Sequence, residues 1–452
     1  MTQKPNRKNR LTLLIFLALI LGIGLGLLLN AQYVQEDNLA IQQVEASVNA
    51  LKSKAVPVAD TAALRQLTEQ KAALVKARDA KLEPFSLLAD IFLRLIKMIV
   101  APLVFSTLVV GVAKLGDIKS VGRIGGKTLL WFFCASLLSL ALGMLLVNLF
   151  QPGAHMHLPI PDAGTDLGLQ KSSFSLKSFL HHIFPVSIFE SLAQNEILQI
   201  VVFSLLFGTA TAAIGEHGKI VIDFFEVVAD IILKITGYVM NLAPIAVFGA
   251  MTAVLTKQGA GILKTYSVFI GEFYLGLASL WLLLTLLAFL FIGTRVFTLL
   301  KRMKDPALLA FSTSSSEAAF PKMMMELERF GCGKKIVSFV LPLGYSFNLD
   351  GSMMYMTFAS LFIAQSYGID LPLATQVSML LVLMLTSKGI AGVPRASLVV
   401  IAGTLSTFNI PEAGLALLLG IDPLLDMGRS ATNVIGNSIA TTLVSKWERE
   451  LQ

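Results

Sequence analysis

The sequence predicts an all-α membrane protein that crosses the bilayer several times, and its composition and its long apolar stretches lead to this prediction. Of the 452 residues, 55% are apolar and 14% are charged, whereas a soluble domain carries about 25% charged residues. The mean hydropathy of +0.74 excludes a water-soluble globule, a coiled coil and a disordered chain. At roughly 20 apolar residues per helical span, the chain has room for around eight spans with their loops.

The charged residues and the cysteines exclude several other classes of protein. The net charge is only +7, which in a membrane protein indicates orientation rather than nucleic-acid binding. Five histidines and two distant cysteines, Cys134 and Cys332, do not make a disulfide framework or a Cys/His metal cage. The sequence lacks an HExxH motif, a Walker loop and a nucleophile elbow, so we expect neither an enzyme nor an organic cofactor.

The first predicted element, residues 1–30, is a cytoplasmic N-terminus followed by one span. Four basic residues precede an apolar run over 11–29, which is too long for a signal peptide and ends without a cleavage motif. Later basic clusters all fall on the side predicted to be cytoplasmic, as the positive-inside rule requires. They lie at 114–127, 301–304 and 446–449. We therefore expect a multi-pass protein of the cytoplasmic (inner) membrane with both termini inside.

The next element, residues 31–84, is polar and balanced in charge, with seven basic and seven acidic residues. Valine and leucine recur at helical spacing on both sides of Pro57, which predicts a helical hairpin outside the cytoplasm. A long loop with balanced charge is translocated without disturbing the orientation. Its composition favours a solvated cap or spacer over a binding module.

Five apolar stretches over residues 85–299 predict the second to sixth spans, and a repeated unit follows them. The stretches lie near 84–114, 124–150, 187–215, 219–256 and 261–299. In each copy of the repeated unit, an apolar hairpin with a small polar tip precedes a helix that contains Asn-x-x-Gly. The first tip is 312–317, followed by Asn348–Gly351, and the second tip is 386–395, followed by Asn433–Gly436. Paired, interrupted apolar segments are the sequence pattern that best indicates a transporter binding site.

Interrupted helices in a membrane need a physical reason, because each unpaired backbone N–H or C=O group costs several kcal/mol in lipid. Such groups are tolerated where they line a cavity, in which free carbonyls coordinate cations and exposed helix N-termini hold carboxylates. The prediction therefore requires a polar chamber between residues 340–356 and residues 424–440, with unwound backbone lining the path of a solute. Continuous helices facing hydrocarbon there would contradict it.

Five charged residues lie inside these otherwise apolar segments, and each costs at least about 2.5–3.5 kcal/mol at a helix centre. They are Asp350, Lys388, Asp422, Asp426 and Arg429. On the last helix, Asp422, Asp426 and Arg429 are followed by Asn433 and Asn437. These five residues are four, three, four and four positions apart, which places their side chains on one helical face. We expect this face to point into the protein.

The same face suits a ligand with an amino group and a side-chain carboxylate. A guanidinium such as that of Arg429 holds a carboxylate with two parallel hydrogen bonds, and an aspartate such as Asp426 can hold an ammonium. The main-chain carboxylate of the ligand would then reach the backbone amides around Ser314–Ser316. An alternative is that Asp426 and Arg429 merely neutralise each other, because they are three residues apart on one helix.

Four motifs, in their order and spacing, resemble those of the dicarboxylate/amino acid:cation symporters, the glutamate transporter family. They are the serine-rich tip, N-L-D-G-S, G-I-A-G-V-P and D-M-G-R-S-x-x-N-V-I-G-N. The resemblance runs from about Leu11 to Trp447 without residues 31–84. It implies a glutamate-transporter-homologue fold with eight transmembrane helices and two re-entrant helical hairpins. It also implies a homotrimer in which a mobile transport domain moves like an elevator against a static scaffold.

The implied boundaries divide the chain into scaffold and transport parts. Helices 2, 4 and 5 of residues 85–299 would belong to the scaffold, and helices 3 and 6 to the transport domain. The later boundaries are hairpin 1 over 300–332, a broken helix 7 over 333–371, hairpin 2 over 372–409, and helix 8 with a cytoplasmic C-terminus over 410–452.

The resemblance also implies the residues that bind substrate. Asp426 would take the amino group, Arg429 the side-chain carboxylate, and the two hairpin tips the main-chain carboxylate. An aspartate at 426 speaks against the pure C4-dicarboxylate branch, and an arginine at 429 against the neutral amino acid branch, so aspartate or glutamate is the favoured substrate. The remaining implied contacts are Ser314, Ser315 and Ser316 in the first tip, Ala391, Gly392, Val393 and Pro394 in the second, and Ser352, Ser430 and Asn433 elsewhere.

The implied cation-coupling residues depart from those of the sodium-coupled members. Asn437 stands in place of an acidic ligand, Ala135 in place of a threonine beside Ser136, and the Lys388 ammonium lies next to carbonyls that would otherwise enclose sodium. Each change weakens a hard-cation site, which needs oxygen ligands and negative charge, and resembles the proton-coupled bacterial glutamate symporters. The coupling positions that remain are Gly344, Ser346, Asn348, Asp350 and Asn433.

Protons are therefore the favoured coupling ions, with Glu317 and Asp350 as candidate carriers, because burial can bring a carboxyl to titrate near neutral pH. A residual sodium ion at Asn348 and Asp350, or a rearranged sodium site, is the alternative. Arg395 also departs from the family: either it contacts a carboxylate or stabilises the gate, or it snorkels to outer water. An anion-conducting channel on the same scaffold is the alternative function. We expect membrane lipid, an acidic amino acid and further copies of the chain as partners.

Overall fold

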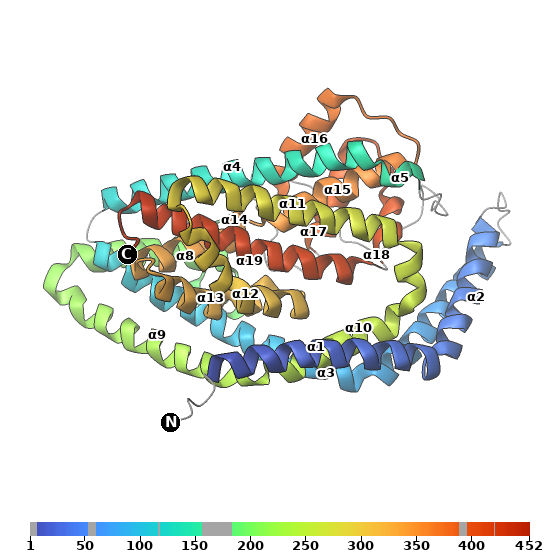
Figure 1. Cartoon of the computed structure of the whole chain (residues 1–452), viewed down its shortest axis with the longest axis horizontal. Helices are drawn as coiled ribbons and strands as arrows, with labels where there is room; N and C mark the ends of the chain where they lie inside the picture. Colours follow the sequence, from blue (N-terminus) through green and yellow to red (C-terminus); the bar gives the residue numbers. More distant parts are fainter. Residues whose placement is uncertain (1–6, 53–59, 116–117, 156–182, 388–395, 420) are drawn as a thin grey trace. The chain divides into compact units, whose positions relative to one another are not determined.

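The structure is a computed structural model that describes residues 7–52, 60–115, 118–155, 183–387, 396–419 and 421–452 (Figure 1). Within these ranges all regular structure is helical, apart from one isolated bridge between Cys332 and Leu451. Five of the described helices are long and apolar enough to cross a membrane, and three shorter apolar helices accompany them. The prediction of an all-α membrane protein with several spans is therefore confirmed.

The described chain divides into two compact units, of which the first consists of Met1–Leu93 and Asn241–Ser267. In this unit α1 (Arg7–Gln32) packs along α10 (Ala243–Thr265). Gly22 permits the close approach, since a Cβ there would lie only 2.8 Å from the backbone oxygen of the facing helix. In lipid, where the hydrophobic effect does not drive helices together, small residues allow the close van der Waals packing that does.

The polar segment predicted over 31–84 is helical on both sides of its connection. It forms α2 (Gln35–Lys52) and the first part of α3 (Asp60–Leu115), while the residues that join them, including Pro57, lie outside the described ranges. The predicted boundary at 84 is not an end of a helix, because α3 continues through Pro84 into the second span. Ion pairs hold the two helices antiparallel: they join Lys71 to Glu45 at 2.8 Å and Lys81 to Asp37 at 2.6 Å.

The second unit consists of Arg94–Met240 and Val268–Gln452. Its earlier elements are α4 (Ile118–Phe150), α5 (Pro152–His155), α7 (Ile188–Gln194), α8 (Ile197–Ala213), η1 (Gly215–Gly218), α9 (Lys219–Val239) and α11 (Ser267–Ile292). The short helix η2 (Met240–Leu242) lies where the chain passes from the second unit to the first. The span predicted over 187–215 is divided between α7 and α8 by Asn195, whose backbone is left-handed with φ 57°. The span predicted over 219–256 is divided by η2.

The last third of the chain consists of shorter helices that are interrupted repeatedly. They are α12 (Arg295–Thr313), α13 (Ser316–Phe330), α14 (Lys334–Phe347), α15 (Asp350–Ser366), α16 (Leu373–Thr386), α17 (Ala396–Thr407), η4 (Glu412–Leu415), α18 (Ala416–Leu419) and α19 (Asp422–Trp447). Helices α12 and α13 pack against each other and are joined by two residues; we call this pair hairpin 1. Between α14 and α15 the backbone is not helical at Asn348 and Leu349.

The helix that contains the second Asn-x-x-Gly is not interrupted, since α19 runs without a break from Asp422 to Trp447. Gly436 has another purpose there. A Cβ on it would collide with the carboxylate of Asp350, so the glycine allows α15 to begin against the side of a continuous helix. The Asn-x-x-Gly pattern thus marks a helix break in one copy and a close approach of two helices in the other.

Helices α14, α15 and α19 form the buried centre of the second unit, where α19 packs against α12, α13, α14 and α15 (Figure 1). Side chains are buried throughout Asp350–Ala364 of α15 and Met427–Ser445 of α19. Burial on every side explains why α15 is apolar in all directions. Since α19 also buries an arginine, two asparagines and several hydroxyls, the interior of this unit must contain a polar region.

Candidate functional site

The tip of hairpin 1 lies against the first turn of α19. Ser314 ends α12 with a left-handed backbone (φ 49°), and its hydroxyl donates to the Pro423 carbonyl at 3.4 Å. Ser315 caps α13, since its hydroxyl accepts a hydrogen bond from the Ala318 amide at 3.3 Å. Ser316, the first residue of α13, accepts a hydrogen bond at its carbonyl from a buried tyrosine of α14. The three serines therefore present the N-terminus of α13 beside the charged residues of α19.

Arg429 is the buried cation at the centre of the site. Its residue is only 3% exposed, and its Nη2 lies 3.3 Å from Asp422 and 2.9 Å from Asp426. The sequence alternative that Asp426 and Arg429 pair with each other thus describes an ion pair that is present. However, Nε and Nη1 of Arg429 are buried without a hydrogen-bond partner. These two donors lie on different edges of the guanidinium, and each remains available for a further acceptor.

Tyr355 supports this arginine from α15, a role that the sequence analysis missed. The guanidinium carbon of Arg429 lies 4.1 Å from the centre of the Tyr355 ring. The Tyr355 hydroxyl donates to Asp422 at 3.0 Å, so one residue holds both members of the ion pair. A polar aromatic residue three positions after Ser352, in an otherwise apolar helix, was the available signal.

Asn433 and Ser352 lie together where α15 begins. The side-chain oxygen of Asn433 accepts hydrogen bonds from the amides of Gly351 and Ser352 at 2.9 and 3.4 Å. Its amide nitrogen donates to the Ser352 hydroxyl at 3.3 Å. Asn433, on α19, therefore accepts hydrogen bonds from amides of the first turn of α15 that have no partner within their own helix. Ser430 is buried one position after Arg429.

The predicted cation-coupling residues meet at the break between α14 and α15. The Asn348 amide nitrogen donates to Asp350 at 3.0 Å and to the side-chain oxygen of Asn437 at 3.2 Å. Gly344 allows this contact, since a Cβ there would collide with the Asn437 side chain. The hydroxyl of Ser346 and the side-chain oxygen of Asn348 are buried without a hydrogen-bond partner. These oxygens beside one carboxylate are ligands of the type that a hard cation binds.

Helix α4 contributes hydroxyls to the same place. Ala135 is buried and contributes none, but the hydroxyl of Ser136 donates to the Phe347 carbonyl at 3.5 Å. Ser139, one turn later, donates to Asp350 at 3.4 Å. The sequence analysis missed Ser139, although its position one helical turn after 135–136 was visible in the sequence.

The remaining predicted residues are not brought into these contacts. Glu317 is half-buried in the first turn of α13. The predicted second tip and its flanks, namely Lys388, Ala391, Gly392, Val393, Pro394 and Arg395, lie outside the described residues. In the part of the chain that the structure describes, no group of three or more His, Cys, Asp or Glu side chains could hold a metal ion.

The chain has several helices that could cross a membrane, together with a buried arginine, three buried or half-buried aspartates and an interrupted helix. These are the features of a membrane transport protein, because such groups are tolerated in a membrane where they serve a solute path. The sequence matches the sodium:dicarboxylate symporter family over residues 11–447, and the chain belongs to this family. It is therefore a transporter and not an enzyme.

Several relatives have assigned activities. The proton/sodium-glutamate symport protein of Geobacillus stearothermophilus is 46% identical over 367 residues, which cover 80% of this chain and 87% of the relative. The protein of the same name from Bacillus subtilis (strain 168) is 42% identical over 366 residues, covering 80% and 85%. The C4-dicarboxylate transport protein of Bacillus subtilis (strain 168) is also 42% identical, over 370 residues that cover 80% and 87%.

Proposed function

We propose that this chain is a secondary active symporter that imports glutamate or aspartate together with cations, and that protons are favoured over sodium. The observation that carries the proposal is Arg429, which is buried beside two aspartates and yet has two donors without partners. A fixed cation with open donors is suited to the side-chain carboxylate of an acidic amino acid. The names of the glutamate symport relatives support the same substrate class.

Three groups of the substrate would find three partners. The side-chain carboxylate would bind Nη1 of Arg429, and the ammonium would bind Asp426, whose side chain is 38% exposed and therefore accessible. The main-chain carboxylate would bind the amides at the N-terminus of α13 around Ser314–Ser316, and the second tip over 391–394 is its other proposed contact. Ser352, Ser430 and Asn433 would complete the surrounding polar contacts.

Asp426 separates this proposal from a C4-dicarboxylate transporter. A dicarboxylate has no ammonium, so it would leave Asp426 facing a second carboxylate at a cost in binding. Competition by aspartate, glutamate and succinate against uptake of labelled aspartate into proteoliposomes tests the choice. We expect both amino acids to compete at least tenfold better than succinate. Stronger competition by succinate would identify a C4-dicarboxylate transporter.

Proton coupling is supported by the neutral Asn437, which leaves one carboxylate, Asp350, in the cluster at the helix break. Glu317 and Asp350 are the candidate proton carriers. The unpartnered oxygens of Ser346 and Asn348 keep a residual sodium ion chemically feasible beside Asp350. Uptake driven by an imposed pH gradient without sodium supports proton coupling. Uptake that occurs only on a sodium gradient would show that sodium is the coupling ion. Current without stoichiometric uptake would favour a channel.

The architecture implied by the sequence completes the proposal. The chain would form eight transmembrane helices and two re-entrant hairpins and assemble as a homotrimer in the inner membrane, with both termini in the cytoplasm. The transport domain, with the third and sixth spans, both hairpins and the last two helices, would move as an elevator against the scaffold. The compact packing of α12–α15 around α19 is consistent with a body that moves as one piece.

A further inference from the structure

Residues Glu448–Gln452 turn back from the end of α19 onto the base of hairpin 1. Their backbone forms an antiparallel bridge with the short loop between α13 and α14. The Gly333 amide donates to the Glu450 carbonyl at 2.8 Å, and the Gln452 amide donates to the Gly331 carbonyl at 2.9 Å. Gly331 must be small here, since a Cβ on it would lie 2.6 Å from the Gln452 oxygen. We call Glu448–Gln452 the clasp.

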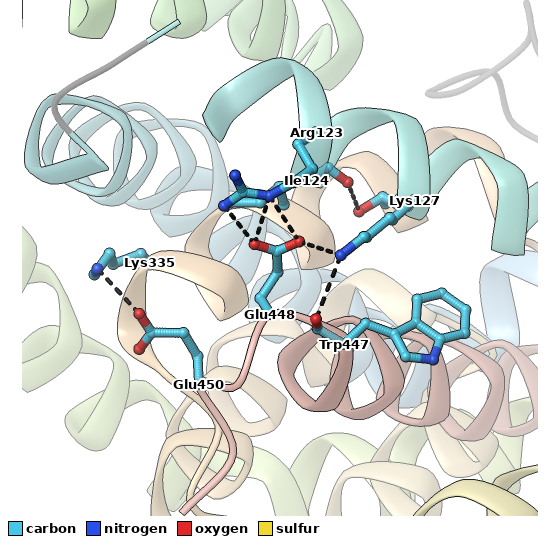
Figure 2. Close-up of polar contacts among 8 residues, drawn as sticks. Arg123, Ile124, Lys127, Lys335, Trp447, Glu448 and Glu450 are labelled. Atoms are coloured by element: carbon cyan, nitrogen blue, oxygen red, sulfur yellow. Dashed lines mark hydrogen bonds and ion pairs between the residues drawn. The ribbon is translucent and has the colours of Figure 1, made fainter. Parts of the chain in front are cut away.

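The first residue of the clasp is held by two cations of α4 (Figure 2). The Glu448 carboxylate accepts hydrogen bonds from Arg123 Nη2 at 2.8 Å and Nε at 3.1 Å, and from Lys127 Nζ at 2.7 Å. Its side chain is 5% exposed, whereas those of Arg123 and Lys127 are 56% and 36% exposed. Because the carboxylate is buried while the cations reach solvent, loss of the pairing would leave a desolvated charge on Glu448.

Further contacts join the clasp to the base of hairpin 1. Lys335, in the first turn of α14, pairs with Glu450 at 3.1 Å (Figure 2). Arg295, the first residue of α12, donates to the Phe330 carbonyl at 3.3 Å and also to the carbonyl of Gln452. The clasp thus connects the cytoplasmic ends of α4, α12, α13 and α14, as defined by the predicted orientation, with α19.

Hairpin 1 is therefore attached to α19 at two distant points. Its base is held by the clasp at the end of α19, and its tip is held at the start of α19 by the bond from Ser314 to Pro423. Between these points α12 packs along α19. With both ends fixed, the hairpin cannot slide along α19 without breaking one attachment. Arg429 lies on the stretch of α19 that this arrangement aligns with the tip.

From these contacts we infer that the clasp sets the register of hairpin 1 against α19, and that Glu448 is a positioning residue for substrate binding. The inference rests on the proposed function, in which one substrate spans the tip amides and Arg429. A ligand that bridges two elements binds well only when their separation is fixed, since small displacements of anchoring groups are costly. Loosening the base would let the tip shift, although Glu448 touches no substrate.

The test is Glu448→Gln in full-length protein, with Glu226→Gln as the matched control. Glu226 of α9 pairs with Lys114, so the control removes an ion pair of the same unit that does not involve hairpin 1. We expect Glu448→Gln to raise the KM for aspartate about three- to tenfold with maximal uptake within about twofold, and the control to change neither. An unchanged KM in a folded Glu448→Gln protein would overturn the inference.

A charge swap and an amide-exchange measurement separate positioning from simple stabilisation. Arg123→Glu combined with Glu448→Arg should have a lower KM for aspartate than Glu448→Arg alone, because the swapped pair can form again although Lys127 repels the new arginine. Hydrogen exchange should accelerate in Glu448→Gln at the base, over 330–335, and also at the tip, over 312–317. Faster exchange confined to the base would overturn the inference. If Glu448→Gln does not fold, Arg123→Gln, which leaves Lys127 in place, is measured in its stead.

The exchange experiment needs no substrate, so the two proposals fail separately. Wild-type protein that takes up neither aspartate nor glutamate would contradict the proposed function. In that case the register claim would still be decided by exchange at the tip, where acceleration supports it and an unchanged rate overturns it.

Discussion

Arg429 is a cation in the interior of a membrane protein, and its neighbours explain how it is tolerated there. Two aspartates share one of its nitrogens, and the face of Tyr355 covers the guanidinium. The ion pairs offset the cost of burial, and the ring adds a cation–π contact that strengthens when it is desolvated. Buried polar atoms in proteins nearly always have a hydrogen-bond partner. The two donors left over are therefore the part of this arrangement that points to a ligand.

Replacing Arg429 with Lys keeps the charge and removes the planar guanidinium. We expect the KM for aspartate to rise about tenfold, because the single ammonium contact of lysine keeps about half of the roughly 3 kcal/mol that a guanidinium contact supplies. Uptake into proteoliposomes measures the change. Arg302→Lys is the control, since that arginine pairs with Glu326 at 3.3 Å away from the site and should leave the KM unchanged. An unaltered KM in Arg429→Lys would refute its assigned role.

Helices α15 and α19 approach each other closely, and glycine makes this approach feasible. Side chains on one face of α19 meet α15 and the break before it. Asp422 and Arg429 contact Tyr355, Asn433 contacts the amides of the first turn of α15, and Asn437 contacts Asn348 in the break. The N-terminus of a helix, a carboxylate and two amides thus share one small volume. Their hydrogen bonds can be made only if the backbones lie within a side chain's width of each other.

Gly436→Ala tests this contact between elements. The added methyl would collide with Asp350 and displace either the carboxylate or the whole start of α15. We expect a loss of about 1–3 kcal/mol in the free energy of unfolding, seen as a lower thermal midpoint, and loss of uptake. Gly126→Ala on α4 has nothing within 4 Å of the new methyl, so it should be neutral or slightly stabilising. Equal behaviour of the two variants would contradict the packing described.

The clasp makes a pH-dependent contribution to stability whose sign follows from Glu448. Burial favours the neutral acid, but hydrogen bonds from Arg123 and Lys127 and their charges outweigh it, so the pKa of Glu448 lies below its ordinary value of 4.5. The contribution is therefore complete above about pH 4.5 and is lost as the pH falls through the lowered pKa. Glu448→Gln should be about 1–3 kcal/mol less stable than wild type at pH 7, and the difference should shrink as the pH falls below about 4.5. Thermal unfolding across pH measures this, and a constant difference would contradict it.

For the whole molecule, the sequence was informative wherever a single segment carries the signal. Composition predicted the membrane class, and the Ser-rich and N-L-D-G-S motifs lie where α12 meets α13 and α14 meets α15. The sequence could not distinguish the two Asn-x-x-Gly patterns, because a glycine that breaks a helix and one that admits a neighbouring helix look alike locally. It also missed Tyr355 and Ser139, whose partners are far away in the chain. The alignment of two helices that are distant in the chain depends on how they pack, so no single segment of the sequence predicts it.

The coupling of the whole transport cycle to an ion depends, in our proposal, on the charge at position 437. Asn437 faces Asn348, which also contacts Asp350, so an aspartate at 437 would put a second carboxylate into a cluster that has one. Two carboxylates with amide and hydroxyl oxygens favour bound sodium, since the ion then offsets their repulsion. We therefore expect Asn437→Asp to make aspartate uptake at least fivefold dependent on sodium and less responsive to a pH gradient. Asn148→Asp is the control, because Asn148 lies on α4 and pairs instead with Gln376, at 2.6 Å. Uptake by Asn437→Asp that remained driven by protons and indifferent to sodium would place the coupling site elsewhere in the molecule.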